Sequence, residues 1–234
     1  MKTKMLKIEM AADPANPKIA DINIYDYVGS PFRDEEDGSN ISTASKFQAE
    51  LKKLGDVSEI RLHVNSQGGL CSEGISIYSQ LLNHAAKKTA YIEGFACSIA
   101  GVIVCACDNV IMSPASQFQM HPARGISYGN ADNFRQYAAE LDSITDGVKS
   151  AYLGKSGGKL TAEKLDELMQ GVDGDGTFLT AQQAMDYGLC DQVSGKSAEP
   201  QKPEEPEPEP DPDTGSRNNA KNNEFVMNMF KMFF

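Results

Sequence analysis

The chain has 234 residues and a mass of 25.4 kDa, with 40% hydrophobic and 24% charged residues, a composition typical of a globular domain with a sizeable core. A formal net charge of -11 and a sequence pI near 4.8 argue against nucleic acid or an anionic membrane as a partner. The longest apolar run, residues 99–107, has nine residues, far fewer than the roughly 20 that span a bilayer. No apolar segment follows the lysines near residue 1, so we expect a cytoplasmic protein.

The predicted secondary structure alternates between strands and helices along residues 19–198. Alternating and helical hydrophobic periodicity distinguish the two kinds of element. Gly68 and Gly69 are expected to break one strand, and Ser42 or Thr43 to cap the first helix. A layered α/β domain with a mostly parallel sheet follows from this order. The predicted strands cover residues 22–28, 60–64, 89–93, 110–112 and 118–120, and the predicted helices cover 43–54, 75–82, 98–107 and 130–153.

The sequence divides into four regions by composition. Residues 1–18 form an N-terminal extension, 19–198 the folded domain, 199–224 a Pro/Glu-rich and polar linker, and 225–234 a hydrophobic Phe/Met tail. Seven acidic residues and six prolines within 199–213 predict an extended, solvated spacer, and the C-terminal tail is expected to be disordered. The tail either docks on another protein or has no role, and the linker is accessible enough for self-cleavage.

Five cysteines, at positions 71, 97, 105, 107 and 190, lie mostly in apolar segments. An odd number in such a context is typical of reduced, packed thiols. Cys105 and Cys107 have the spacing of a metal-binding pair, but no second ligand pair accompanies them. We therefore expect no metal and no cofactor.

Glycine-rich turns at residues 65–69 (NSQGG) and 94–101 (GFACSIAG) each follow a strand and precede a helix. Backbone N–H groups are exposed at such turns and bind anions. Ser98 lies in the second turn among small residues, which leaves its hydroxyl accessible. A nucleophilic serine needs a base, and we interpret His63 and His84 as structural because one lies mid-strand and the other on a polar helix face. His121 lies at a strand end, where active-site side chains are commonly displayed.

The order GFACSIAG, MHPARG (120–125), GNAD and FLTAQQAMDYGL (178–189) resembles the Clp peptidase family, and most closely its phage branch of head maturation (prohead) proteases. The resemblance covers about residues 20–193. It implies a ClpP/crotonase-like spiral of β-β-α units in a single domain. It also implies a serine endopeptidase with the chain order Ser, His, Asp. The spatial arrangement of such a triad recurs on unrelated folds with different chain orders.

By this resemblance Ser98 is the nucleophile and His121 the general base, with the backbone N–H groups of Ile99 and of Gly68 or Gly69 as the oxyanion hole. The family places its acid two residues before the aromatic residue of the FLTA-like segment, and Gly176 occupies that position here. Asp175 is the favoured substitute, since flanking glycines let the loop bulge. Asp173, or a Ser–His dyad without an acid, remains an alternative.

The function that the resemblance implies is ATP-independent processing of a phage capsid or scaffold protein, or of the chain itself. The partners would be these substrate proteins and further copies of the chain in a ring-like homo-oligomer, in the bacterial host cytoplasm or inside the procapsid. One alternative is a catalytically weak scaffold or assembly protein that acts through its C-terminal tail. Another is a crotonase-type enzyme acting on a thioester, which would not need Ser98 and His121 together.

Overall fold

The computed structural model describes residues 10–13, 16–29 and 43–195. The chain divides into two units, Met1–Gly195 and Lys196–Phe234. The predicted linker and hydrophobic tail belong to the second unit and lie outside the described residues, as does the charged loop at 34–38. In the part that the structure describes, no helix is long and apolar enough to cross a membrane.

One mixed sheet forms the centre of the domain, in the strand order β1-β2-β3-β4-β5-β8, and β6 pairs with both β4 and β7. The pairs β1/β2 and β6/β7 are antiparallel and the other pairs are parallel. The mostly parallel α/β sheet predicted from the sequence is therefore confirmed. The strands are β1 (Met10–Asp13), β2 (Asn16–Val28), β3 (Glu59–Gly69), β4 (Lys87–Cys97), β5 (Asn109–Met112), β6 (Gln117–Met120), β7 (Thr177–Thr180) and β8 (Gln192–Val193).

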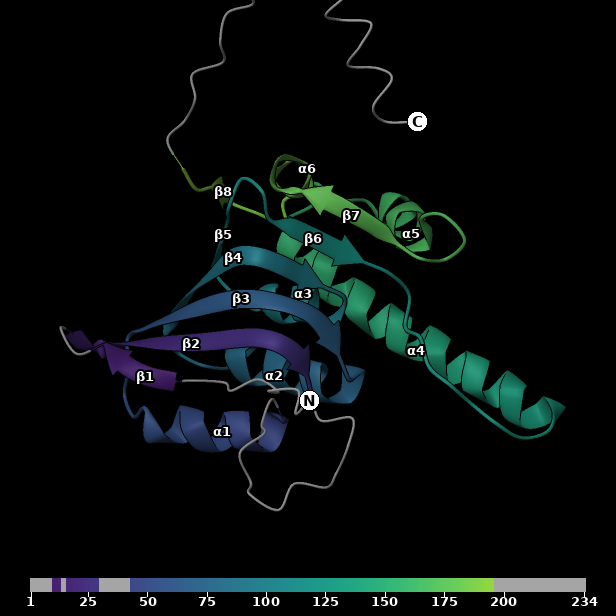
Figure 1. Ribbon diagram of the computed structural model, residues 1–234, viewed down its shortest axis with the longest axis horizontal. Coiled ribbons are helices and arrows are strands. Elements are labelled where there is room, and N and C mark those ends of the chain that lie inside the picture. Colours follow the sequence, from purple (N-terminus) through teal and green to yellow (C-terminus); the bar gives the residue numbers. More distant parts are fainter. Residues whose placement is uncertain (1–9, 14–15, 30–42, 196–234) are drawn as a thin grey trace, which may run out of the picture. The chain divides into compact units, whose positions relative to one another are not determined.

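Helices α1 (Ala44–Lys53), α2 (Cys71–Leu82) and α3 (Ile99–Val104) lie together along one side of β2, β3 and β4 (Figure 1). The strands present alternate residues to the core; Ile22, Leu62 and Ala90 are aligned across the three strands and fully buried. Burying one such aliphatic side chain contributes about 1.5–3 kcal/mol. This apolar layer fixes the register of the strands whose ends carry the glycine-rich turns.

The other residues of these strands form a polar network. Arg61 binds Asp21, and His63 lies 2.9 Å through Nδ1 from Glu93 Oε1 and 3.5 Å through Nε2 from Asp21 Oδ1. Tyr25 donates to Glu93, and this bond with burial raises the pKa of Tyr25 to about 12. His63 thus takes part in cross-strand pairing, in keeping with the structural role predicted for it.

Helix α4 (Ala131–Ser156) begins at a capping box formed by Asn130 and Asn133 and ends at Gly157, which has a left-handed φ of 60°. Val148 and Tyr152 are buried, whereas Phe134 is 52% exposed. The N-terminal half of α4 extends away from the sheet (Figure 1). Only the C-terminal half of the apolar stripe predicted for residues 130–153 therefore belongs to the core of this chain. Helices α5 (Ala162–Gln170) and α6 (Ala181–Asp186) complete the domain.

Three boundaries differ from the sequence-based expectations. Met10–Asp13 and the start of β2 were expected within an N-terminal extension, but Met10 pairs with Ile22 in the sheet; prolines nearby mask this strand in the sequence pattern. β3 includes Gly68 and Gly69, which stay paired with β2, so the expected break lies after Gly69 and not before these glycines. Helix α3 is shorter than predicted, since Ser98 is its N-cap and tighter turns follow Val104.

Candidate active site

Ser98 occupies a sharp turn between β4 and α3. Its backbone has φ 56° and ψ −129°, and only one other described non-glycine residue, Asp173, has a positive φ. Such a conformation costs a non-glycine residue about 1–3 kcal/mol. The turn is fixed on both sides, because Ser98 N–H donates to Gln119 O at 2.8 Å and Tyr152 Oη–H donates to Ser98 O at 3.2 Å. A half-buried serine is thus displayed on a rigid, strained turn, as at a nucleophile elbow.

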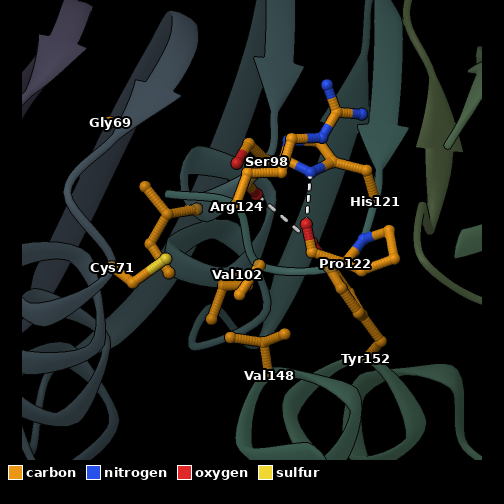
Figure 2. Close-up of a pocket in the computed structure, with 11 residues that line it drawn as sticks. Gly69, Cys71, Ser98, Val102, His121, Pro122, Arg124, Val148 and Tyr152 are labelled. Atoms are coloured by element: carbon orange, nitrogen blue, oxygen red, sulfur yellow. Dashed lines mark hydrogen bonds between the residues drawn. The ribbon is translucent and has the colours of Figure 1, made fainter. Parts of the chain in front are cut away.

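His121 reaches the same place from the end of β6. The parallel pairing of β4 with β6 sets Cys97 beside Gln119, so the residues that follow the two strands are neighbours. Ser98 and His121 both line a cavity of about 130 Å³. Figure 2 shows the two side chains together at the upper part of this cavity. The structure therefore brings the predicted nucleophile and base to one site.

The imidazole of His121 is fixed by a backbone carbonyl. Its Nδ1 lies 2.7 Å from Pro122 O, and since a carbonyl oxygen only accepts, Nδ1 carries the hydrogen. In the neutral ring Nε2 then holds the lone pair that a general base needs. Burial lowers the pKa of His121 below its usual value of 6.5, and Arg124 lowers it further, against opposing effects of the Pro122 hydrogen bond and Asp175. The ring is held in the neutral form at neutral pH.

The glycine-rich end of β3 packs directly against the serine turn. Gly68 has φ 94°, and a Cβ added there would lie 2.7 Å from Ser98 Cβ and from Cys97 O. Its N–H donates to Ser66 Oγ at 3.1 Å, whereas Gly69 lines the cavity. Leu70 N–H donates to Val28 O on β2. Of the two predicted glycine donors, Gly69 is the better placed.

The predicted acid, Asp175, is near His121 but is bound to another residue. Its carboxylate lies 3.2 Å from Arg124 Nη2, and its side chain is 79% exposed. It acts on His121 through charge, raising the pKa of the imidazole, while Pro122 O occupies Nδ1. Asp173 lies on the same loop, exposed, at φ 55°. Gly176 fills the position next to the histidine, because a Cβ there would lie 2.5 Å from His121 Cβ.

Two further groups contribute to the cavity and were not singled out from the sequence. Cys71, Val102 and Val148 form apolar walls below Ser98, and Arg124 lies at the His121 side. Arg124 lies within the MHPARG segment that carries the resemblance. The spacing of an arginine three residues after a histidine does not by itself predict a functional role for the arginine. The contribution of Cys71 depends on the fold, which begins α2 directly at the cavity.

The cysteines of the core are free thiols. Cys105 and Cys107 are buried, and burial raises the pKa of each. Within residues 10–13, 16–29 and 43–195, no group of three or more His, Cys, Asp or Glu side chains is arranged to hold a metal ion. His84, the third histidine, accepts a hydrogen bond from Ala86 N–H at 3.1 Å, a local structural contact.

A serine on a strained strand-to-helix turn, with a histidine and a glycine-rich turn at one cavity, resembles the arrangement of a serine hydrolase on an α/β fold. Residues 37–197 match the model of the Clp protease family, and the chain belongs to this family, whose activity is that of serine peptidases. Proteins named "ATP-dependent Clp protease proteolytic subunit" from three strains of Dehalococcoides mccartyi are 29% identical to it over 140 residues. The aligned part covers 59% of this chain and 67% of each relative.

Proposed function

We propose that this chain is a serine endopeptidase in which Ser98 is the nucleophile and His121 the general base. The observation that carries the proposal is the shared cavity, where Ser98 stands on a positive-φ turn beside a histidine whose Nδ1 donates to Pro122 O. Nothing in a packing role requires a strained serine next to an imidazole with this tautomer. Strain of this kind collects at functional sites.

The reaction follows from these groups. His121 Nε2 removes the Ser98 proton as Oγ attacks the peptide carbonyl, and the imidazolium then protonates the leaving amine. The N–H groups of Ile99 and Gly69 receive the developing oxyanion, and one such donor lowers the barrier by about 2.7–4 kcal/mol. The second half of the cycle uses water in place of Ser98. The apolar walls formed by Cys71 and Val102 accommodate an apolar substrate side chain.

Asp175 is proposed as the third member of the triad, acting through its charge. A carboxylate near the imidazole stabilises the imidazolium that forms during the reaction. Pro122 O already fixes the tautomer, so Asp175 has only the electrostatic part of the usual role. The contribution of Asp175 is therefore expected to be smaller than the 10⁴-fold effect of a buried triad aspartate.

The decisive test is labelling with a fluorophosphonate probe, which reacts only with an activated serine. Wild-type protein is expected to be labelled and to cleave peptides. Ser98→Ala should lose both the labelling and the cleavage, while its free energy of unfolding stays within about 0.5 kcal/mol of the wild-type value. Ser113→Ala, a half-buried serine outside the cavity, is the matched control and should be labelled normally. Equal labelling of wild type and Ser98→Ala would refute the assignment.

The biological setting is proposed from the sequence resemblance. We infer that the substrates are capsid or scaffold proteins of a phage, that cleavage proceeds without ATP in the host cytoplasm or procapsid, and that the active form is a ring-like homo-oligomer. The exposed half of α4, with Phe134, offers a surface for such assembly. Co-expression with capsid and scaffold proteins, with native mass spectrometry of the product, tests this. An active monomer, or cleavage that requires an added ATPase, would contradict it.

A further inference from the structure

Arg124 places a cation at the candidate active site of an acidic chain. Its side chain lines the same cavity as Ser98 and His121, and its charge lowers the pKa of His121. In Figure 2 it extends along the His121 imidazole, with the guanidinium at the outer end. The side chain is 50% exposed. A group in this position is accessible to a substrate that reaches Ser98.

The protein contacts of Arg124 use only part of its binding capacity. Nη2 donates to Gly174 O at 3.1 Å and lies 3.2 Å from Asp175 Oδ1. A guanidinium carries five N–H donors in a planar fork. In the part of the chain that the structure describes, no protein partner is found for the Nη1 and Nε donors. Both edges of the guanidinium that bind a carboxylate through two parallel hydrogen bonds include Nη2, so the donors left for a further carboxylate are those of Nη1 and Nε, used singly and assisted by the charge.

We propose that Arg124 is a specificity-determining residue that binds a substrate carboxylate close to the scissile bond. The substrate class is thus a peptide with an apolar side chain for the walls around Val102 and an Asp or Glu side chain within two residues of the cleaved bond. Arg124 holds the 174–175 loop through Nη2 and the substrate through its other donors. The inference rests on the proposed peptidase function, and it adds the recognition of an acidic residue.

The overall charge of the protein makes this preference diagnostic. A net charge of -11 disfavours acidic peptides in general, because like charges repel over about 10 Å at moderate ionic strength. A preference for an acidic peptide therefore has to come from a local cation. Asp175, although bound to Arg124, is 79% exposed, and such pairs contribute little, so it competes weakly with a substrate carboxylate.

The test separates binding from turnover. Full-length Ser98→Ala is titrated, by fluorescence anisotropy, with labelled peptides that differ by a single Glu or Gln at each of the two positions on either side of the bond. At one position the Glu peptide is expected to bind about fivefold more tightly, as a half-exposed charge pair allows. The preference should vanish in Ser98→Ala/Arg124→Gln and shrink when salt is raised to about 0.5 M.

Matched variants exclude a merely structural effect. Arg135→Gln removes an arginine that pairs with Asp132 on α4, away from the cavity, and should keep the preference. Arg124→Lys keeps the charge without the planar fork and should keep only part of it. Asp175→Asn removes the competing carboxylate and should leave the preference intact or increase it.

The outcomes distinguish the two proposals. If Ser98 is labelled by the fluorophosphonate probe but the Glu-to-Gln ratio does not respond to Arg124→Gln, this inference is wrong and the peptidase assignment stands. A ratio of one in the Ser98→Ala protein itself also overturns it. If Ser98 is not labelled and neither peptide binds, the cavity is not a peptide site and both proposals fall.

Discussion

Gly176 occupies the place next to His121 where the family resemblance expects an acid, and the structure explains why a side chain cannot simply be restored there. Its φ is 77°, and an added Cβ would lie 2.1 Å from Met120 O and 2.5 Å from His121 Cβ. Gly174, two residues earlier, has φ 80°, yet its added Cβ would meet only Gln170 Nε2, at 3.7 Å. The two glycines thus share a backbone conformation and differ in their surroundings.

The two surroundings predict different costs for alanine at positions 174 and 176. Both alanine variants bear the left-handed conformation, which costs about 1–2 kcal/mol. At position 176 the contact with Met120 O must also lengthen from 2.1 Å to at least 3.0 Å, and such overpacking costs a further 1–3 kcal/mol, roughly. Because the atoms that must move belong to the backbone at His121, the base shifts by a sizeable fraction of an ångström. A misplacement of about 1 Å reduces catalysis about 100-fold.

The assay is the second-order rate of fluorophosphonate labelling at Ser98, with urea unfolding measured in parallel. We expect Gly174→Ala to label at close to the wild-type rate, and Gly176→Ala to be slower by about 100-fold and less stable than Gly174→Ala. Gly176→Asp should fail in the same way, even though it restores the family acid. If Gly176→Ala labels as fast as Gly174→Ala, or Gly176→Asp is faster than wild type, the contact with His121 does not control the base.

Three further predictions concern pH, the acid and the tail. Burial and Arg124 lower the pKa of His121 while Asp175 raises it, so the acid limb of the labelling rate should lie below pH 6.5, and should move to higher pH in Arg124→Gln and to lower pH in Asp175→Asn. Stopped-flow labelling from pH 4.5 to 8 measures both shifts. If the acid limb moves in the same direction in both variants, this electrostatic account is wrong. Asp175→Asn should slow peptide cleavage by about 3- to 30-fold, as an exposed, indirectly acting carboxylate allows, and Asp173→Asn by less than twofold; equal losses in steady-state assays would assign the effect to the loop. Truncation after Ala198 should leave labelling unchanged but weaken association with the capsid or scaffold partner in pull-downs, and a truncated protein that still processes its partner fully would leave the tail without a function.

Much of the fold was predictable because its signals are local. Alternation in β3, the cap at Thr43 and the start of α4 near residue 130 each depend on neighbours along the chain, and the structure has them where the sequence predicts them. The pairing of Met10 with Ile22 depends on a distant strand edge, so a short alanine-rich segment near prolines gives no warning of it. The exposure of Phe134 was not predictable either. Helical periodicity shows that one face of α4 is apolar, but it does not show how much of that face the core of the domain covers.

The site was predictable to the degree that it is built from strand ends. Ser98 and His121 follow strands that lie side by side, so an ordered pair of motifs was enough to predict that the two residues share one site. The sequence alone does not distinguish Gly68 from Gly69, whereas the structure shows that Gly68 N–H donates to Ser66 Oγ and that Gly69 lines the cavity. Pro122 could not be found at all from the pattern, since its contribution is a carbonyl oxygen that every residue has.

The loop at 171–176 explains why Asp175 does not contact Nδ1 of His121. A carboxylate two residues before Phe178 would have to extend from a backbone already in contact with His121; glycine occupies that position, and the proposed acid, Asp175, stands one residue earlier. At that distance Asp175 meets Arg124 rather than Nδ1, and Nδ1 turns to the nearest acceptor, Pro122 O. Arg124, which binds Asp175, lines the same cavity as His121. In our proposals, the glycine at position 176 leaves Asp175 an indirect electrostatic role, and Arg124 adds the recognition of a substrate carboxylate.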